Sequence, residues 1–174
     1  KNPGYSAGST NWKSSREFAQ YTSACLTTRG MHSWKYGRFE MRGRIDIRSG
    51  IWPAFWSLGV EKPWPQNGEV DIMEFYRGTL LANLIWAGPK GKQSVTRRKP
   101  VTSFDDPDWA KKFHVWRMDW DERRMVITVD GLVLNDTSLD TTLNPDGWNP
   151  FRQPEYLMLN LAIGGDAGGD PAAT

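Results

Sequence analysis

The sequence predicts an all-β sandwich built from antiparallel strands. Short stretches of alternating apolar and polar residues recur along the chain, and turns rich in Gly and Pro separate them. No stretch carries the 3.6-residue apolar period of a helix of useful length. A chain of 174 residues is long enough for one domain with a sizeable core. We therefore expect residues 1–174 to form a single domain.

The expected strands begin after a polar, turn-rich loop over residues 1–20. We expect strands at residues 21–28, 36–47, 50–59, 68–75, 80–86, 113–120, 125–135 and 156–163. The segment 125–135 contains Asp130-Gly131, which is typical of a two-residue hairpin turn, so it is expected to divide into two strands. Residues 89–107 are expected to form a long polar loop, and the glycine-rich residues 164–169 a flexible one.

Three acidic residues lie within six positions of the otherwise apolar strand at 68–75: Glu69, Asp71 and Glu74. Acids are uncommon in strands, and burying one without a partner is costly. Side chains alternate between the two faces of a strand, so Glu69 and Asp71 share a face whereas Glu74 would point at the core. One extra residue at Ile72-Met73, a β-bulge, would return Glu74 to the acidic face. We therefore predict a bulged strand with one apolar and one acidic face.

Ten tryptophans are unusually many for this length. Trp52 and Trp56 share a face of their strand, about 13 Å apart at ~3.3 Å per residue. Such a pair suits either a groove that stacks on several sugar rings or the core, and the strand pattern alone leaves both interpretations open. Paired carboxylates beside such a groove indicate glycoside hydrolysis, in which one carboxylate attacks the anomeric carbon and the other protonates the leaving oxygen. Calcium, the other common ligand of clustered acids, usually takes its ligands from flexible loops, which fits this strand poorly.

The remaining composition narrows the class of protein. A net charge of +2 gives no indication of nucleic acid binding, and no apolar run approaches the roughly 20 residues of a membrane span. The single cysteine, Cys25, is expected to be a buried structural thiol, and His114 a histidine of the core. The basic run at residues 97–99 is expected to be a solvated surface, with contact to an anionic ligand as the alternative.

Three motifs resemble family 16 of the glycoside hydrolases, in its bulge-containing branch of laminarinases and related endo-β-glucanases. They are GIWPAFW at residues 50–56, GEVDIME at 68–74 and YLMLNLAIGG at 156–165, and they occur in the family's order. The resemblance implies a jelly-roll β-sandwich with a concave, substrate-binding sheet. By motif match, Glu69 would be the nucleophile, Glu74 the general acid/base and Asp71 the residue that tunes the pair. It also implies substrate contacts from Trp52, Trp56, Trp64, Glu40, Arg42 and Asn83.

The function that this resemblance implies is internal hydrolysis, with retention, of β-1,3- or mixed-linkage β-1,3-1,4-glucan. Many laminarinases carry a His on the strand after the acids, whereas residues 83–86 contain none, so a hydrolase of marine galactans (agar, porphyran or carrageenan) is an alternative. A non-catalytic β-glucan-binding protein is a second alternative, although such a protein would be expected to have lost the acids.

Several further expectations follow from the resemblance. The family's terminal strands are not recognisable, so either the domain is truncated at both ends or the sandwich is completed in another way. A structural calcium ion is common in the family but has no assignable ligands here, and no cofactor is expected to be required. Trp86 could face either the groove or the core. We expect a secreted, periplasmic or cell-surface monomer whose partner is a polysaccharide or oligosaccharide, and neither nucleic acid nor membrane.

Overall fold

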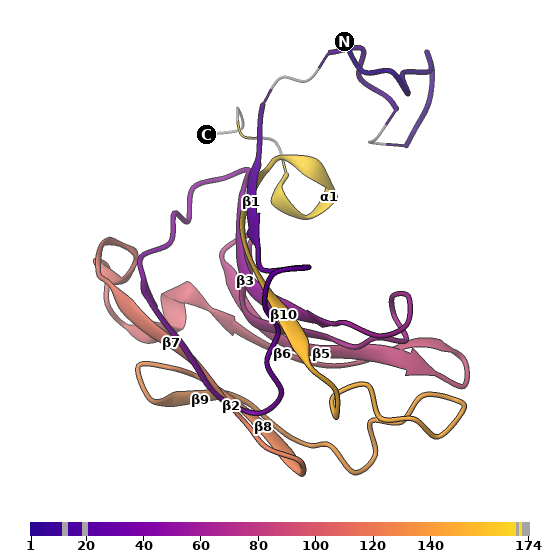
Figure 1. Ribbon diagram of the computed structural model, residues 1–174. Coiled ribbons are helices and arrows are strands. Elements are labelled where there is room, and N and C mark those ends of the chain that lie inside the picture. The colour runs from indigo at the N-terminus through magenta and orange to yellow at the C-terminus, as the bar shows by residue number, and fades with distance from the viewer. Residues whose placement is uncertain (12–13, 19–20, 170, 172–174) are drawn as a thin grey trace.

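Two antiparallel sheets pack face to face in the computed structural model, which describes residues 1–11, 14–18, 21–169 and 171 (Figure 1). The larger sheet has the strand order β1-β10-β3-β4-β5-β6, and the smaller one has the order β2-β7-β8-β9. The six strands of the larger sheet are β1 (Ala24–Thr27), β10 (Glu155–Ile163), β3 (Ile51–Gly59), β4 (Glu69–Tyr76), β5 (Thr79–Gly88) and β6 (Gly91–Pro100). The smaller sheet contains β2 (Gly37–Gly43), β7 (His114–Trp120), β8 (Arg124–Val129) and β9 (Leu132–Ser138). The predicted jelly-roll sandwich is confirmed.

Most of the expected strands are found within a few residues of their predicted bounds. The hairpin at Asp130-Gly131 is confirmed, and both residues have the positive φ of a type I′ turn, 49° and 82°. The expected loop at 89–107 is wrong, because this range contains β6 and the short 3₁₀ helix η1 (Val101–Phe104). A second 3₁₀ helix, η2 (Trp109–Lys111), follows it. β6 pairs only with β5 and is mostly exposed, so its sequence is polar and lacks the alternation that marks a half-buried strand. The short helix α1 (Gly165–Gly168) follows β10.

The hydrophobic core fills the space between the sheets. Its fully buried side chains include Ile72 and Phe75 from the larger sheet and Trp116 from the smaller one. Trp86 also belongs to this core, where its ring meets that of Phe151 at a centroid distance of 6.1 Å, so the sequence ambiguity resolves in favour of the core.

His114 is a buried histidine of the structure, as expected. Its Nδ1 lies 2.7 Å from the carboxylate of Asp130, and its Nε2 lies 2.7 Å from the carbonyl oxygen of Trp109. His114 therefore links the β8–β9 hairpin, through Asp130, to η2, through Trp109.

β1 is an edge strand whose four residues are all exposed, and Leu26 is 71% exposed. It pairs only with β10, and the smaller sheet does not extend beneath this end of the sandwich (Figure 1). Leu159 and Leu161 on β10 are accordingly 41% and 40% exposed. The expectation of a buried thiol at Cys25 is wrong for the same reason: its strand is at the edge, and neither face is covered.

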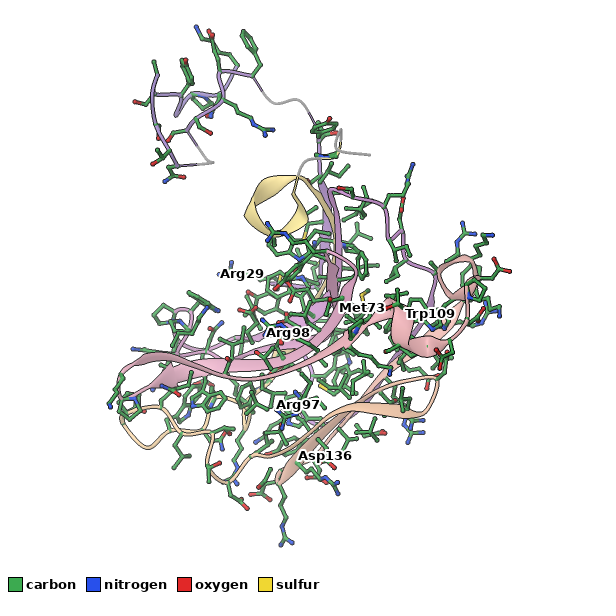
Figure 2. All side chains as sticks on the ribbon, turned by 180° about the vertical axis from the view of Figure 1, so that it is seen from behind. Arg29, Met73, Arg97, Arg98, Trp109 and Asp136 are labelled. Atoms are coloured by element: carbon green, nitrogen blue, oxygen red, sulfur yellow. The ribbon has the colours of Figure 1, made fainter. Side chains whose placement is uncertain are left out.

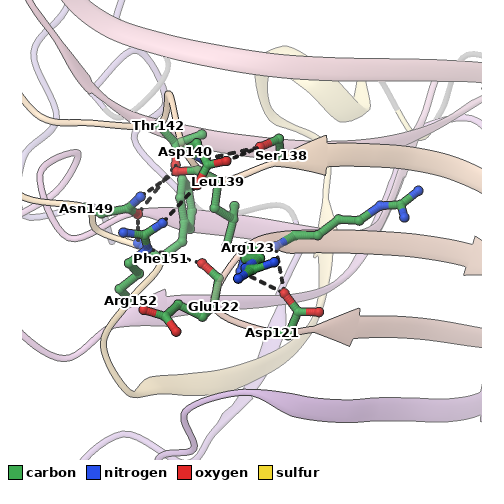
Figure 3. A network of polar contacts seen from close by, with 11 residues as sticks. Asp121, Glu122, Arg123, Ser138, Leu139, Asp140, Thr142, Asn149, Phe151 and Arg152 are labelled. Carbon is green, nitrogen blue, oxygen red and sulfur yellow. Dashed lines mark hydrogen bonds and ion pairs between the residues drawn. The ribbon is translucent and has the colours of Figure 1, made fainter.

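The segment 139–154, which connects β9 to β10, has no regular structure but is fixed by hydrogen bonds (Figure 3). The amide of Asn149 donates to the carbonyl of Leu139 at 2.6 Å and accepts from the backbone N–H of Phe151 at 3.0 Å. Arg152 donates to the Asp140 carboxylate at 3.1 Å. These hydrogen bonds hold the segment 139–154 in one conformation, so it can support neighbouring parts of the fold.

One such neighbour is the loop at residues 60–68, which leads into β4. Asn144 donates to the carbonyl oxygen of Gln66 at 2.7 Å, and Asp146 accepts a charged hydrogen bond from Lys62 at 2.5 Å. The loop carries Trp64, which is 52% exposed. The segment 139–154 therefore determines where Trp64 lies.

Candidate active site

The predicted β-bulge in β4 is confirmed by the pairing of β4 with β5. Asp71 pairs with Asn83 and Glu74 pairs with Leu81, so three steps along β4 match two steps along β5. The extra residue lies in Ile72–Met73, and both of these side chains are buried in the core. The bulge returns Glu74 to the face that carries the other two acids, as the sequence predicts.

The three carboxylates lie in a groove on the face of the larger sheet that points away from the core. The cavity has a volume of about 430 Å³ and is lined by strands β3, β4 and β10 together with the loop before β4. Its lining includes Trp52, Trp56, Trp64, Glu69, Asp71 and Glu74. The structure thus brings six of the nine expected site residues into one groove, while their contact with a substrate stays a prediction.

Each glutamate receives a hydrogen bond from an indole. Trp52 Nε1 donates to Glu74 Oε1 at 2.8 Å, and Trp64 Nε1 donates to Glu69 Oε2. Trp56 instead donates to Asn160 Oδ1 on β10 at 2.7 Å. Two of the tryptophans therefore orient the glutamates as well as lining the groove.

Asn83 on β5 lies beside the carboxylates and is 4% exposed. Its Nδ2 donates to Asp71 Oδ2 at 2.8 Å and to Glu74 Oε2 at 3.1 Å. The role that the structure shows for Asn83 is to hold two acids together, and direct contact with a sugar stays a prediction. Asp71 itself is also 4% exposed, so it acts on the groove through its neighbours.

Burial raises the pKa of all three carboxyls. The pKa of Asp71 is raised the most, well above its usual range, first by burial and then by the charges of Glu69 and Glu74. The indole bonds oppose the effect of burial on the two glutamates, because they stabilise the ionised form.

The two glutamates differ in their nearby charges. The charge of Glu69 further raises the pKa of Glu74, whereas Lys92 lowers the pKa of Glu69. Arg98 also lowers the pKa of Glu74, so each glutamate has one cation nearby, while burial raises both pKa values.

The expected placement of Glu40 and Arg42 in the groove is wrong. Both lie on β2, which belongs to the smaller sheet, and both are exposed. The guanidinium of Arg42 lies 4.6 Å from the centroid of the Phe113 ring. The alternating charges of this strand reflect a solvated outer face, since its apolar face packs on the core.

The basic run at residues 97–99 was recognised in the sequence, but its nearness to the carboxylates was not, because that segment was expected to be a loop. Arg98 pairs with Leu81, which pairs with Glu74, and Arg98 lowers the pKa of Glu74. Arg97 and Arg98 lie on opposite sides of the larger sheet (Figure 2). A strand assignment at residues 91–100 would have placed Arg98 on the groove face by alternation.

Over the described ranges of the chain, no group of three or more His, Cys, Asp or Glu side chains is arranged to hold a metal ion. The same part of the chain contains no helix that is long and apolar enough to cross a membrane.

A sandwich whose concave sheet holds paired glutamates among tryptophans defines a carbohydrate-active protein of the glycosidase class. More specifically, the chain belongs to family 16 of the glycosyl hydrolases, whose model matches residues 5–174.

Similar proteins are known in sequence and in structure. The chain is 34% identical over 171 residues to a beta-glucanase of Rhodothermus marinus, covering 90% of this chain and 59% of that protein. A structure from a study of endo-acting O-glycanases, with which human gut bacteria initiate mucin breakdown, has a TM-score of 0.82 at 30% identity. That match covers 97% of this chain and 62% of the other. The laminarinase catalytic domain of Thermotoga maritima has a TM-score of 0.71 at 32% identity, covering 86% and 61% of the two chains. This chain thus spans about three-fifths of the length of each of these relatives.

Proposed function

We propose that this chain is an endo-acting glycosidase that hydrolyses β-1,3- or mixed-linkage β-1,3-1,4-glucan with retention of anomeric configuration. The observation that carries the proposal is the bulged strand β4, which presents Glu69 and Glu74 on one face of an open groove. An open groove admits the middle of a polymer, as internal cleavage requires. The names of the relatives from Rhodothermus and Thermotoga support β-glucan as the substrate.

The chemistry assigns one role to each glutamate. Glu69 attacks the anomeric carbon and forms a glycosyl ester, while Glu74 gives its proton to the leaving glycosidic oxygen. Glu74, now ionised, then takes a proton from water, and the water oxygen displaces Glu69 from the anomeric carbon. Each displacement inverts the configuration, so the two together retain it. Asp71 and Asn83 hold the pair, and the reaction requires no cofactor.

The test is incubation of the purified chain with laminarin and barley β-glucan, with new reducing ends as the measurement. Wild-type protein should release oligosaccharides of mixed length, and the first-formed anomer, observed by NMR, should be β. Glu69→Gln should lose turnover while keeping its fold and its binding of laminarin. No products from either glucan, or a first-formed α anomer, would contradict the proposal.

A second candidate is hydrolysis of an internal bond in a mucin-type O-glycan. The observation that favours it is the match to the O-glycanase study, which has a higher TM-score and covers more of this chain than the laminarinase match. Release of oligosaccharides from gastric mucin, with none from laminarin or barley β-glucan, would select this candidate. Adding agarose and porphyran to the panel tests the galactan alternative in the same assay.

The setting of the protein follows from such a substrate. Polymeric β-glucans are too large to diffuse across membranes, so we propose that the chain acts outside the cytoplasm, secreted or at the cell surface. We also propose that it acts as a monomer, because all three acids belong to one strand. Fractionation of the native host and light scattering of the purified chain test these two statements.

A further inference from the structure

A second cavity adjoins the groove and shares Leu58 and Trp64 with it. We call this cavity, of about 820 Å³, the basic pocket. Among the described residues, its lining includes Arg29, His32 and Lys62 but no Asp or Glu. The groove therefore continues past Glu69 and Trp64 into a space with the opposite charge.

The outer wall of the basic pocket is held in place without a ligand. It is formed by residues 29–33, and the chain on each side is bonded to β10. At one end Thr28 and Leu157 exchange two hydrogen bonds, each of 3.0 Å. At the other end Trp34 and Glu155 exchange backbone hydrogen bonds of 3.0 and 2.8 Å. A wall fixed at both ends provides a preformed binding surface.

The cations of the basic pocket are not equally available. The ammonium of Lys62 is bonded to Asp146 and lies 4.4 Å from the Trp148 ring. The guanidinium of Arg29 lies 5.6 Å from the Tyr156 ring, and no ion pair joins it to an acid within the described part of the chain. Arg29 therefore offers an uncompensated fork of N–H donors, which matches the geometry of a sulfate or carboxylate group.

The basic pocket also offers groups that suit a sugar ring. Trp64 and Tyr156 present aromatic surfaces. Asn67 is 4% exposed, and its Oδ1 accepts no hydrogen bond from the described residues. Protein atoms enclose this oxygen, so the groups that a sugar ring can reach in the basic pocket are the two aromatic surfaces.

We propose that the basic pocket binds a sugar unit of the substrate that carries an anionic substituent, a sulfate ester or a carboxylate, and that Arg29 binds the anion. This inference rests on the proposed function, because it assigns the pocket to the glycan chain that Glu69 and Glu74 cleave. The substrate class that it names is an acidic glycan. Lys92, whose ammonium lies 5.8 Å from the Trp64 ring, adds a further positive charge near the junction with the groove.

The test compares three soluble glucans: laminarin, laminarin sulfate and carboxymethylated laminarin. Arg29→Gln should lower the ratio of kcat/KM on an anionic glucan to kcat/KM on laminarin by about tenfold, the effect of one charge-assisted hydrogen-bond pair. Arg29→Lys, which keeps the charge, should retain most of the ratio. Arg123→Gln, on the β8 side of the molecule, is the matched control and should leave the ratio unchanged. The sulfated and carboxymethylated substrates together identify which anion is preferred.

A binding experiment separates this inference from the proposed function. If no glucan is cleaved, glucose 6-sulfate, glucuronic acid and glucose are each titrated against Glu69→Gln, with tryptophan fluorescence as the readout. An anionic sugar should bind about tenfold more tightly than glucose, and the preference should disappear in the Glu69→Gln/Arg29→Gln double variant and weaken with added salt. Equal binding of all three sugars, or a ratio of kcat/KM that Arg29→Gln leaves unchanged, would overturn the inference.

Discussion

The two glutamates proposed as catalytic, Glu69 and Glu74, are held in the same way by different kinds of structure. Glu74 receives its indole bond from Trp52 on β3, a strand inside the sheet with β10 on one side and β4 on the other. Glu69 receives its bond from Trp64, which stands on an exposed loop. The indole that binds Glu74 is thus fixed by the sheet, whereas the indole that binds Glu69 is held by a loop.

The loop is firm only because another segment supports it. Asn144 and Asp146 bond to Gln66 and Lys62, and the network around Asn149 fixes the segment in turn (Figure 3). We therefore expect substitutions in the supporting segment to affect Glu69 through the loop, and to leave Glu74 unaffected. Substitutions at the glutamates, at their indole donors and in the supporting segment test this difference, in order of decreasing expected effect on activity.

Replacing either glutamate by alanine should lower kcat on laminarin at least about a thousandfold, since each removes a group that reacts. The two variants should differ when azide is added. Azide can replace the side chain of Glu69 and give an α-glycosyl azide, whereas in Glu74→Ala it attacks the glycosyl ester and gives a β-glycosyl azide. NMR of the product with a dinitrophenyl glycoside as substrate distinguishes them, and the reverse assignment would exchange the roles of the two glutamates.

Removing each indole donor should shift a different limb of the pH profile. Trp52→Phe removes a hydrogen bond that lowers the pKa of Glu74, so the pKa rises and the alkaline limb of kcat/KM moves to higher pH. Trp64→Phe raises the pKa of Glu69 by the same reasoning, so the acid limb moves to higher pH. Each variant should also lose about tenfold in kcat/KM at the optimum. Movement of the same limb in both variants would mean that the two bonds do not act on separate groups.

Loosening the supporting segment should reproduce the Trp64 effect in a weaker form. Asn144→Ala and Asp146→Asn should each lower kcat/KM about threefold and move only the acid limb upward, because each removes one of the bonds that join the segment to the loop. Asp119→Asn, which breaks an ion pair with Arg38 on the smaller sheet, is the matched control and should change neither value. An alkaline shift in Asp146→Asn would show that the support reaches Glu74 as well.

A third glutamate, Glu155, lies outside the groove and should affect stability alone. It is 2% exposed, its carboxylate accepts a hydrogen bond from the hydroxyl of Ser57, and burial raises its pKa to about 8. The folded state therefore keeps a proton that the unfolded state releases near pH 4.5, and stability is lost as the pH rises from there through about 8. Glu155→Gln should match the wild-type Tm at pH 4.5, exceed it at pH 9 and keep its activity. Parallel pH dependence of the two Tm values would contradict this account.

The fold and the centre of the site could be predicted from the sequence because they rest on patterns of period two. The alternation in β2 reflects partial burial on one face, and the break in alternation at Ile72–Met73 required a bulge. The two indole hydrogen bonds could not be predicted from the sequence. The bond from Trp64 to Glu69 depends on the conformation of a loop. The bond from Trp52 to Glu74 depends on the register between β3 and β4, which neither strand's sequence specifies.

The errors share a different cause, which is that alternation does not reveal the sheet to which a strand belongs. Glu40 and Arg42 lie on a strand with the expected alternation but on the opposite layer. Cys25 lies on a strand that neither layer covers. β6 shows no alternation because it is an edge strand that carries polar residues on both faces. The nearness of Arg98 to Glu74 was missed together with that strand.

The bulge in β4 also bears on which insertions and deletions this site can survive. Removing one codon from Ile72–Met73 would leave Glu69, Asp71 and Glu74 on alternate positions, so the three acids would still share a face without a bulge. A deletion one position earlier or later would remove an acid or its neighbour in the core. Loss of Ile72 or Met73 would therefore leave all three acids on the same face of β4. It would also remove one buried side chain from the core and straighten the strand.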